Sequence, residues 1–198
     1  MRIIAGTARS LPLASVEGID TRPTTDRIKE TLFNILQKDI PGCTFLDLFA
    51  GSGSIALEAV SRGAKKAVLV EKNRKAVKCI QSNIDFTGFG GQCDLIPMDY
   101  LDALHLIEGK YVFDLVYLDP PYGKGMARAA LDALKKSRLI GADSQLIVEE
   151  SIDFDPGTLE DGYTIIRIKQ YKTNQHIFLE RTSSFPDEPA VVISHGSH

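Results

Sequence analysis

A rigid acidic loop, Asp119-Pro120-Pro121-Tyr122, follows an apolar run over residues 113–118. The two prolines restrict the loop to an extended backbone. The exocyclic amino group of a nucleobase is a poor nucleophile because its lone pair is delocalised into the ring. A site that methylates it must accept both N–H bonds and orient the nitrogen. The Asp119 carboxylate and the Pro120 carbonyl can accept these bonds, and Tyr122 can stack on the base. These three residues are the predicted catalytic set.

A second loop, rich in glycine, follows the apolar run 44–49. Gly51 and Gly53 allow positive φ and close approach of a ligand, and a helix start there offers unpaired N–H groups. Residues 51–56 also fit the dinucleotide pattern G-x-G-x-x-A. Asp47 discriminates between cofactors, because its carboxylate would repel a pyrophosphate but suits ammonium and sulfonium charges. S-adenosylmethionine carries both.

Two further acidic residues stand just after strand-like runs. Glu71 lies twenty positions beyond Gly51 and is placed to accept hydrogen bonds from two ribose hydroxyls. Asp99 can accept one from an adenine amino group. Each has an ordinary alternative, which is a surface ion pair with a neighbouring lysine for Glu71 and a helix N-cap for Asp99.

Strand-like and helical runs alternate from residue 44 onward. The expected strands are 44–49, 67–71, 93–97, 112–118 and 145–149, and the expected helices are 54–62, 74–86, 100–107 and 124–137. Such alternation predicts βαβ units and a parallel sheet covered on both faces. Residues 163–169 and 175–181 indicate a closing antiparallel hairpin. The predicted fold class is therefore α/β, three-layered and Rossmann-like, with a mostly parallel seven-stranded sheet.

The length of 198 residues suggests one domain with small additions. Residues 1–40 are expected to form an extension packed on the core: a short strand, a loop, and a helix over 25–37 capped by Thr24 or Thr25. Residues 41–182 are the expected main domain. Residues 183–198 are expected to be a loosely ordered tail.

Composition narrows the classes of function. The net charge of −3 argues against indiscriminate coating of nucleic acid, although residues 1–138 carry +3 and residues 139–198 carry −6. The three cysteines lack metal-ligand spacing, so no metal is predicted. No run approaches the roughly 18 to 20 apolar residues that span a bilayer, and the start lacks a secretory signal. We expect a cytoplasmic protein that acts as a monomer.

Several motifs resemble one bacterial family. They are the loop 47–53, the Asp119 loop, Arg-Ile-Ile-Ala-Gly at 2–6, Arg-Pro-Thr-Thr-Asp-Arg at 22–27, and the helical run 57–64. The two loops resemble class I S-adenosylmethionine-dependent methyltransferases. The N-terminal motifs are similar to those of the family that methylates guanine N2 in 16S ribosomal RNA, the small-subunit guanine-966 type. The resemblance covers about residues 1–182.

This resemblance implies S-adenosylmethionine as cofactor and 16S rRNA as substrate, within an assembled or assembling small ribosomal subunit. The implied cofactor-binding residues come from the glycine loop and the acidic strand ends: Asp47, Phe49, Ala50, Gly51, Gly53, Glu71 and Asp99. The predicted RNA-binding residues lie over the base pocket: Arg22, Thr24, Arg27 and Lys29. Their cations suit RNA phosphates, and ordinary surface solvation is the alternative.

The chain departs from the family pattern at two places. Ser10 stands where the family usually has glycine, which bears on the backbone shape of the N-terminal hairpin. The segment beyond Arg181 has no recognised counterpart.

Three other functions agree with parts of the sequence. A DNA adenine-N6 methyltransferase suits the Asp119 loop, but duplex readout normally requires a further module of roughly 80 residues, and none is left over. A non-catalytic RNA-binding assembly factor would not require both loops. A dehydrogenase is disfavoured by Asp47. His105 and His176 show no partner acid at a recognisable spacing, and the acidic pair 149–150 is not part of the predicted catalytic set.

Overall fold

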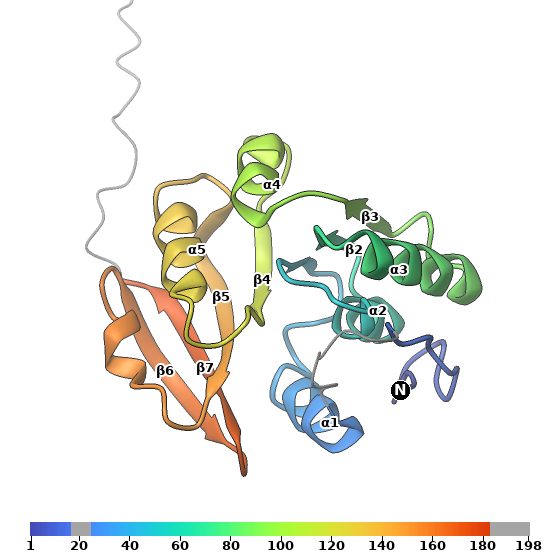
Figure 1. The fold of residues 1–198 in the computed structure, drawn as a ribbon, viewed down its shortest axis with the longest axis horizontal. Coiled ribbons are helices and arrows are strands. Elements are labelled where there is room, and N and C mark those ends of the chain that lie inside the picture. The colour runs from blue at the N-terminus through green and yellow to red at the C-terminus, as the bar shows by residue number, and fades with distance from the viewer. Residues whose placement is uncertain (17–24, 183–198) are drawn as a thin grey trace, which may run out of the picture.

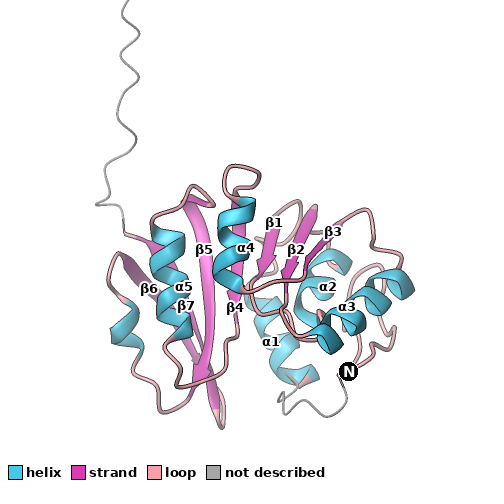
Figure 2. Ribbon diagram, turned by 45° about the horizontal axis from the view of Figure 1, so that its top comes forward, coloured by secondary structure: helices cyan, strands magenta, loops and turns pink. Residues whose placement is uncertain are grey.

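A seven-stranded sheet forms the middle layer of the protein. The computed structural model describes residues 1–16 and 25–182. The strands are β1 (Thr44–Asp47), β2 (Lys66–Val70), β3 (Cys93–Ile96), β4 (Phe113–Leu118), β5 (Ile140–Ser151), β6 (Tyr163–Gln170) and β7 (Asn174–Arg181). Their order is β3-β2-β1-β4-β5-β7-β6, and β7 runs antiparallel to the other six strands (Figure 2). The predicted Rossmann-like class I fold is confirmed.

Helices cover both faces of the sheet (Figure 1). One face carries α1 (Asp26–Ile35), α2 (Ser54–Ser61) and α3 (Arg74–Thr87). The other carries α4 (Tyr100–Ile107) and α5 (Met126–Lys135), and a 3-10 turn, η1 (Pro156–Leu159), precedes β6. Each described helix is too short or too polar to span a bilayer.

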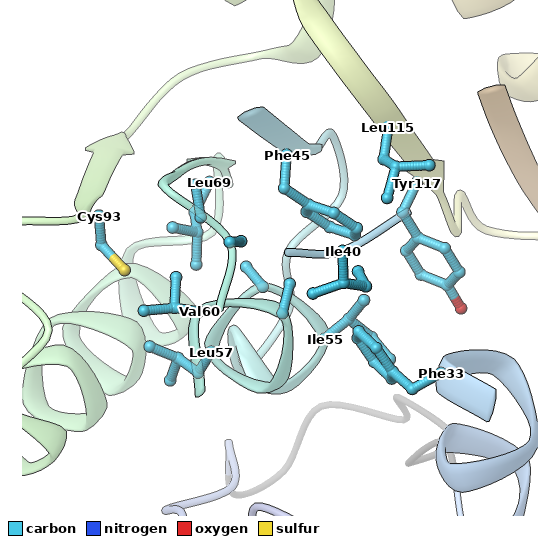
Figure 3. Close-up of a cluster of buried hydrophobic side chains, with 14 of the residues drawn as sticks. Phe33, Ile40, Phe45, Ile55, Leu57, Val60, Leu69, Cys93, Leu115 and Tyr117 are labelled. Carbon is cyan, nitrogen blue, oxygen red and sulfur yellow. The ribbon is translucent and has the colours of Figure 1, made fainter. Parts of the chain in front are cut away.

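Alternation along the strands supplies both cores. In β1, Phe45 packs with the α1–α3 helices and Leu46 packs with α4 and α5. Successive side chains of a strand point to opposite faces, so a strand covered on both sides reads as a continuous apolar run. Figure 3 shows the first of these cores, in which Phe33 of α1 lies near Ile55 and Tyr117. Each fully buried side chain of this size contributes about 1.5–3 kcal/mol.

The N-terminal segment docks on α2 through backbone contacts. The Glu58 carboxylate accepts hydrogen bonds from the N–H groups of Ile4 (2.7 Å) and Ala5 (3.0 Å). Gly6 approaches so closely that a Cβ atom there would lie 1.8 Å from the carbonyl oxygen of Ser61. The expected short strand is reduced to a single bridge between Arg2 and Pro12.

Helix α1 begins as expected and lies alongside α2. Thr25, one of the two predicted caps, accepts a hydrogen bond from the N–H of Ile28. Lys29 of α1 pairs with Glu58 of α2. One turn further along both helices, the guanidinium of Arg62 lies 5.1 Å from the centre of the Phe33 ring. The two helices therefore run in the same direction, and both begin toward the edge at which the parallel strands end.

Strand β5 is longer than predicted. The sequence indicated residues 145–149, because Gly141-Ala142-Asp143-Ser144 has the composition of a turn. In the structure Ile140 pairs with Phe113 of β4, and β7 extends the other end as far as Ser151. Residues 141–144 lie at a register shift between the pairs Phe113–Ile140 and Leu115–Gln145, so the turn-like segment is an irregularity that the flanking pairs hold within one strand. The division at residues 40 and 182 stays a prediction, and residues 183–198 lie outside the described part.

Ser10 has φ of 71°, a left-handed conformation that no other described residue except glycine adopts. For a residue with a Cβ atom this conformation costs roughly 1–2 kcal/mol, partly offset by the greater unfolded-state entropy of glycine. We therefore expect Ser10→Gly to raise the free energy of unfolding by about 0.5–1 kcal/mol in urea denaturation. Ser15→Gly, at a residue without positive φ, is the matched control and should give no gain. Equal effects of the two changes would contradict this interpretation.

Candidate active site

Four acidic side chains meet at the edge where the central parallel strands end. Asp47 ends β1, Asp119 follows β4, and Glu149 and Glu150 lie near the end of β5. Because β1, β4 and β5 are adjacent in the sheet, these carboxyl groups share one edge. In open α/β sheets this edge is the place where ligands bind.

Asp47 is a buried carboxyl group at the end of β1. Its residue is 1% exposed, and neither carboxyl oxygen accepts a hydrogen bond of normal geometry from a described residue. Burial raises the pKa of Asp47 to about 7, with a further contribution from Glu71, while the nearby N–H groups of Phe49 and Ala56 oppose the rise. An acceptor left in this state fits a ligand that brings its own positive donor, such as an ammonium group.

The glycine loop has the backbone that the sequence predicted. Gly51 and Gly53 have φ of 56° and 78°, and Gly53 caps the start of α2. A Cβ atom at Gly51 would meet nothing within 4 Å, so this stretch of backbone is open to a ligand. Glu71 braces the loop by accepting the N–H of Gly51 (2.9 Å) and the N–H of Asn73 (2.7 Å). Its predicted contact with ribose hydroxyls stays a prediction.

The remaining cofactor candidates have visible structural roles. Asp99 is the N-cap of α4, accepting the N–H of Leu101 at 3.2 Å, and it pairs with Lys72. Asp99 therefore has the N-cap role that is the alternative to cofactor binding, and its contact with adenine stays a prediction. The Phe49 ring packs 4.9 Å from that of Tyr100, and Ala50 donates its N–H to the Val70 carbonyl. Phe49 and Ala50 both line this edge of the sheet.

The Asp119 loop lies in a strongly negative environment. Burial and the charges of Glu149, Asp47 and Glu150 raise the pKa of Asp119 well above its ordinary value. Pro120 is buried, and the half-buried Tyr122 donates its hydroxyl to Glu149 at 3.1 Å. The loop therefore presents an acidic group and an aromatic ring together, as the catalytic prediction requires.

Sequence reasoning missed the residues behind this loop. Glu149 accepts hydrogen bonds from Tyr117 (2.5 Å), Asn174 (2.6 Å) and His176 (3.0 Å) in addition to Tyr122. His176 lacks a partner acid in sequence but has one in space, because β7 pairs His176 with Glu149 directly. The only available signal was an acid and a histidine on two expected strands, whose register a single sequence does not reveal.

The predicted RNA-binding residues separate into three groups. Arg27 is exposed on the first turn of α1, which faces the site edge. Lys29 is fully buried and bonds Glu58 and the Arg2 carbonyl, so its assignment to an RNA surface was wrong. Lys29 is buried because it lies on the apolar stripe of α1, next to a buried acid. Arg22 and Thr24 lie outside the described residues.

Comparison with known proteins gives consistent results. The family model described as Conserved hypothetical protein 95 matches residues 1–180. Ribosomal RNA small subunit methyltransferase D of Haemophilus influenzae is 36% identical over 172 residues, which cover 85% of this chain and 88% of the relative. The structure of yhhF from Escherichia coli, a methyltransferase candidate, is 29% identical, covers 91% of this chain and 97% of its own, and has a TM-score of 0.79.

A more distant structure shares the fold alone. The RNA methyltransferase from Salinibacter ruber in complex with S-adenosyl-L-homocysteine is 16% identical and has a TM-score of 0.66. The match covers 84% of this chain and 97% of that one.

The isolated carboxyl group of Asp47 should make stability depend on pH. Its pKa is about 7 when folded, against about 3.9 in an unfolded chain, so the folded state binds the proton more tightly. Stability is therefore lost as pH rises from about 4 to 7. Asp47→Asn should raise the free energy of unfolding by about 1–4 kcal/mol at pH 8, and by much less at pH 4.5. Urea denaturation at both pH values measures this.

The exposed Asp143 provides the matched control. Asp143→Asn should leave the pH dependence of the wild-type chain intact. A gain from Asp47→Asn that is the same at both pH values would show that burial does not hold a proton on this group.

Proposed function

The chain belongs to the bacterial family of 16S ribosomal RNA methyltransferases that the matched family model and relatives represent, and from this premise we propose its target. The target is the exocyclic N2 amino group of one guanine in 16S rRNA, presented by an assembled or assembling small subunit. The observation that carries this proposal is the placement of Asp119 between Asp47 and Glu149, with Tyr122 beside it.

The cofactor is S-adenosylmethionine, which supplies, when bound, a methyl group carried on a positively charged sulfur. The residues of the edge fit such a group. Asp47 offers an unpartnered buried carboxyl group, and Gly51 offers open backbone. Glu71, held by two backbone N–H groups, retains acceptor capacity for hydroxyl groups. A cation placed among these groups would relieve the mutual repulsion of the carboxylates.

The chemistry of the pocket favours guanine over adenine. Guanine presents two adjacent donors, N1–H and the N2 amino group, whereas adenine presents its amino group beside an acceptor nitrogen. Asp119 and Glu150 both border the loop as carboxyl groups, and the Pro120 carbonyl can only accept. When these carboxyl groups are ionised, the edge consists of acceptors, which pair with two donors and would repel the acceptor nitrogen of adenine.

Asp119 also suits the proton balance of the reaction. The amino nitrogen gains a methyl group and loses one proton, leaving a neutral methylamino group. Burial and neighbouring charges raise the pKa of Asp119, so its carboxylate is a stronger base than an exposed aspartate. Asp119 and Pro120 orient the nitrogen by accepting its hydrogens, and Asp119 then takes the released proton. Tyr122 fixes the plane of the base.

RNA is expected to approach from the edge at which α1 begins. Arg27 is exposed there, and Arg22 and Thr24 precede it in the chain. The opposite edge of the sheet is acidic, with Asp39 and Asp114 among the residues that line a cavity of about 350 Å³. Because Asp39 and Asp114 are exposed, whereas Asp47 and Glu149 at the site edge are buried, phosphates would be repelled more strongly from that side. Because the net charge is only −3, we propose that ribosomal proteins present the target loop to a cytoplasmic monomer.

The test is transfer of labelled methyl from S-adenosylmethionine to small subunits lacking the modification, beside protein-free 16S rRNA and duplex DNA. We expect N2-methylguanosine in the subunits, with the labelled nucleoside identified by mass. Asp119→Ala should reduce transfer by at least about 100-fold and leave the dissociation constant of the cofactor within about threefold. The exposed Asp143→Ala is the matched control and should transfer normally.

Two results would contradict the proposal. N6-methyladenine in the DNA reaction would replace the target while keeping the chemistry. Equal loss of cofactor binding and transfer in Asp119→Ala would contradict the separation of a base pocket from a cofactor site.

A further inference from the structure

Glu149 accepts hydrogen bonds from four side chains next to the Asp119 loop. We infer that Glu149 is a positioning residue, which holds the Tyr122 ring in place beside Asp119 so that the target base is received in one orientation. This inference rests on the proposed transfer to a base amino group, because it assigns Tyr122 to the face of that base.

Four donors converge on this one carboxylate. Oε1 accepts from the Tyr122 hydroxyl at 3.1 Å and from Asn174 Nδ2 at 2.6 Å. Oε2 accepts from the Tyr117 hydroxyl at 2.5 Å and from His176 Nε2 at 3.0 Å. Burial alone would raise the pKa of Glu149, but the hydrogen bonds from His176, Tyr117 and Asn174 outweigh it and lower the pKa below its ordinary value. The group is thus a charged acceptor, whose hydrogen bonds are stronger than neutral ones.

Three of the four donors belong to the rigid sheet. Tyr117 lies on β4, and Figure 3 shows its ring next to Leu115 with the hydroxyl pointing away from the apolar cluster. Asn174 and His176 lie on β7 and are 4% and 0% exposed. His176 is held from its other side, where Nδ1 lies 3.2 Å from the Tyr171 hydroxyl. The three donors of the sheet therefore hold the Glu149 carboxylate in place independently of Tyr122.

Tyr122 is the one member of the set that comes from the loop. It is half-buried, and it is followed by Gly123 and Gly125, both with positive φ. Pro120 and Pro121 restrict the backbone before the ring, but the glycines leave the backbone after it free to change conformation. The hydrogen bond to Glu149 limits this freedom, because it ties the end of the ring to the sheet. A ring held at both ends stacks on a base with little further loss of entropy.

A double-mutant cycle tests the link between the two residues. Tyr122→Phe keeps the ring and removes the donor, and Glu149→Gln keeps the shape and removes the charge. We expect each to lower kcat/KM for the nucleic acid by roughly 10- to 100-fold, with the cofactor dissociation constant within about threefold of wild type. The double variant should be no worse than the more damaging single variant, since both changes remove the same interaction.

Tyr111→Phe is the matched control. The Tyr111 hydroxyl donates to Asp94 at 2.6 Å, so it too is a tyrosine bound to a carboxylate, but near the start of β4 and away from the site. It should leave kcat/KM unchanged. Multiplicative losses in the double variant, or full activity of Tyr122→Phe, would overturn the inference.

A second readout does not depend on the nucleic acid that accepts the methyl group. The chain has six tyrosines, and in protein labelled with 3-fluorotyrosine the 19F resonance missing from Tyr122→Phe identifies residue 122. We expect a slowly flipping ring in the wild type and an averaged signal in Glu149→Gln. An averaged signal in the wild type would overturn the inference. A different methylated nucleoside would instead overturn the proposed target, and the cycle would be measured on that nucleic acid.

Discussion

Negative charge crowds the edge of the sheet where β1, β4 and β5 end. Asp47, Asp119 and Glu149 are brought there by strand order alone, in surroundings that disfavour ionised groups. The protein meets this repulsion in two ways. Four donors keep Glu149 charged, whereas Asp47 and Asp119 have raised pKa values and hold protons more readily. The Glu149 carboxylate is thereby structural, and the other two are the groups that we propose for the cationic cofactor and for the amino group of the target nucleobase.

A buried acid also organises the part of the chain that precedes the sheet. Glu58 of α2 accepts two N–H groups of the N-terminal segment and pairs with Arg62 and Lys29. Because all its acceptor sites are occupied, this carboxylate fixes α1 parallel to α2 and turns the start of α1 toward the active edge. Asp47 differs from Glu58, because among the described residues its oxygens accept no hydrogen bond of normal geometry, and we propose that it is kept for a ligand.

The sequence allowed prediction of features that depend on local chemistry. Alternating apolar runs predict the strands, and glycines that need positive φ and prolines after a strand-end acid predict the two loops of the site. Features that depend on which residues meet across the fold could not be predicted. The sequence does not reveal that Lys29 is buried, because this depends on its contact with Glu58 of another helix. The contact of Glu149 with His176 likewise depends on a strand register that the sequence does not specify.

The crowding of carboxyl groups is tested most directly by counting the protons exchanged when the cofactor binds. Isothermal titration calorimetry at pH 6.5, in buffers that differ in ionisation enthalpy, gives this number. Because burial holds the pKa of Asp47 at about 7, a cation that enters the edge beside this group should displace its proton into the buffer. Net proton release on binding of S-adenosylmethionine is the predicted result. Binding heats that do not change with the buffer would contradict it.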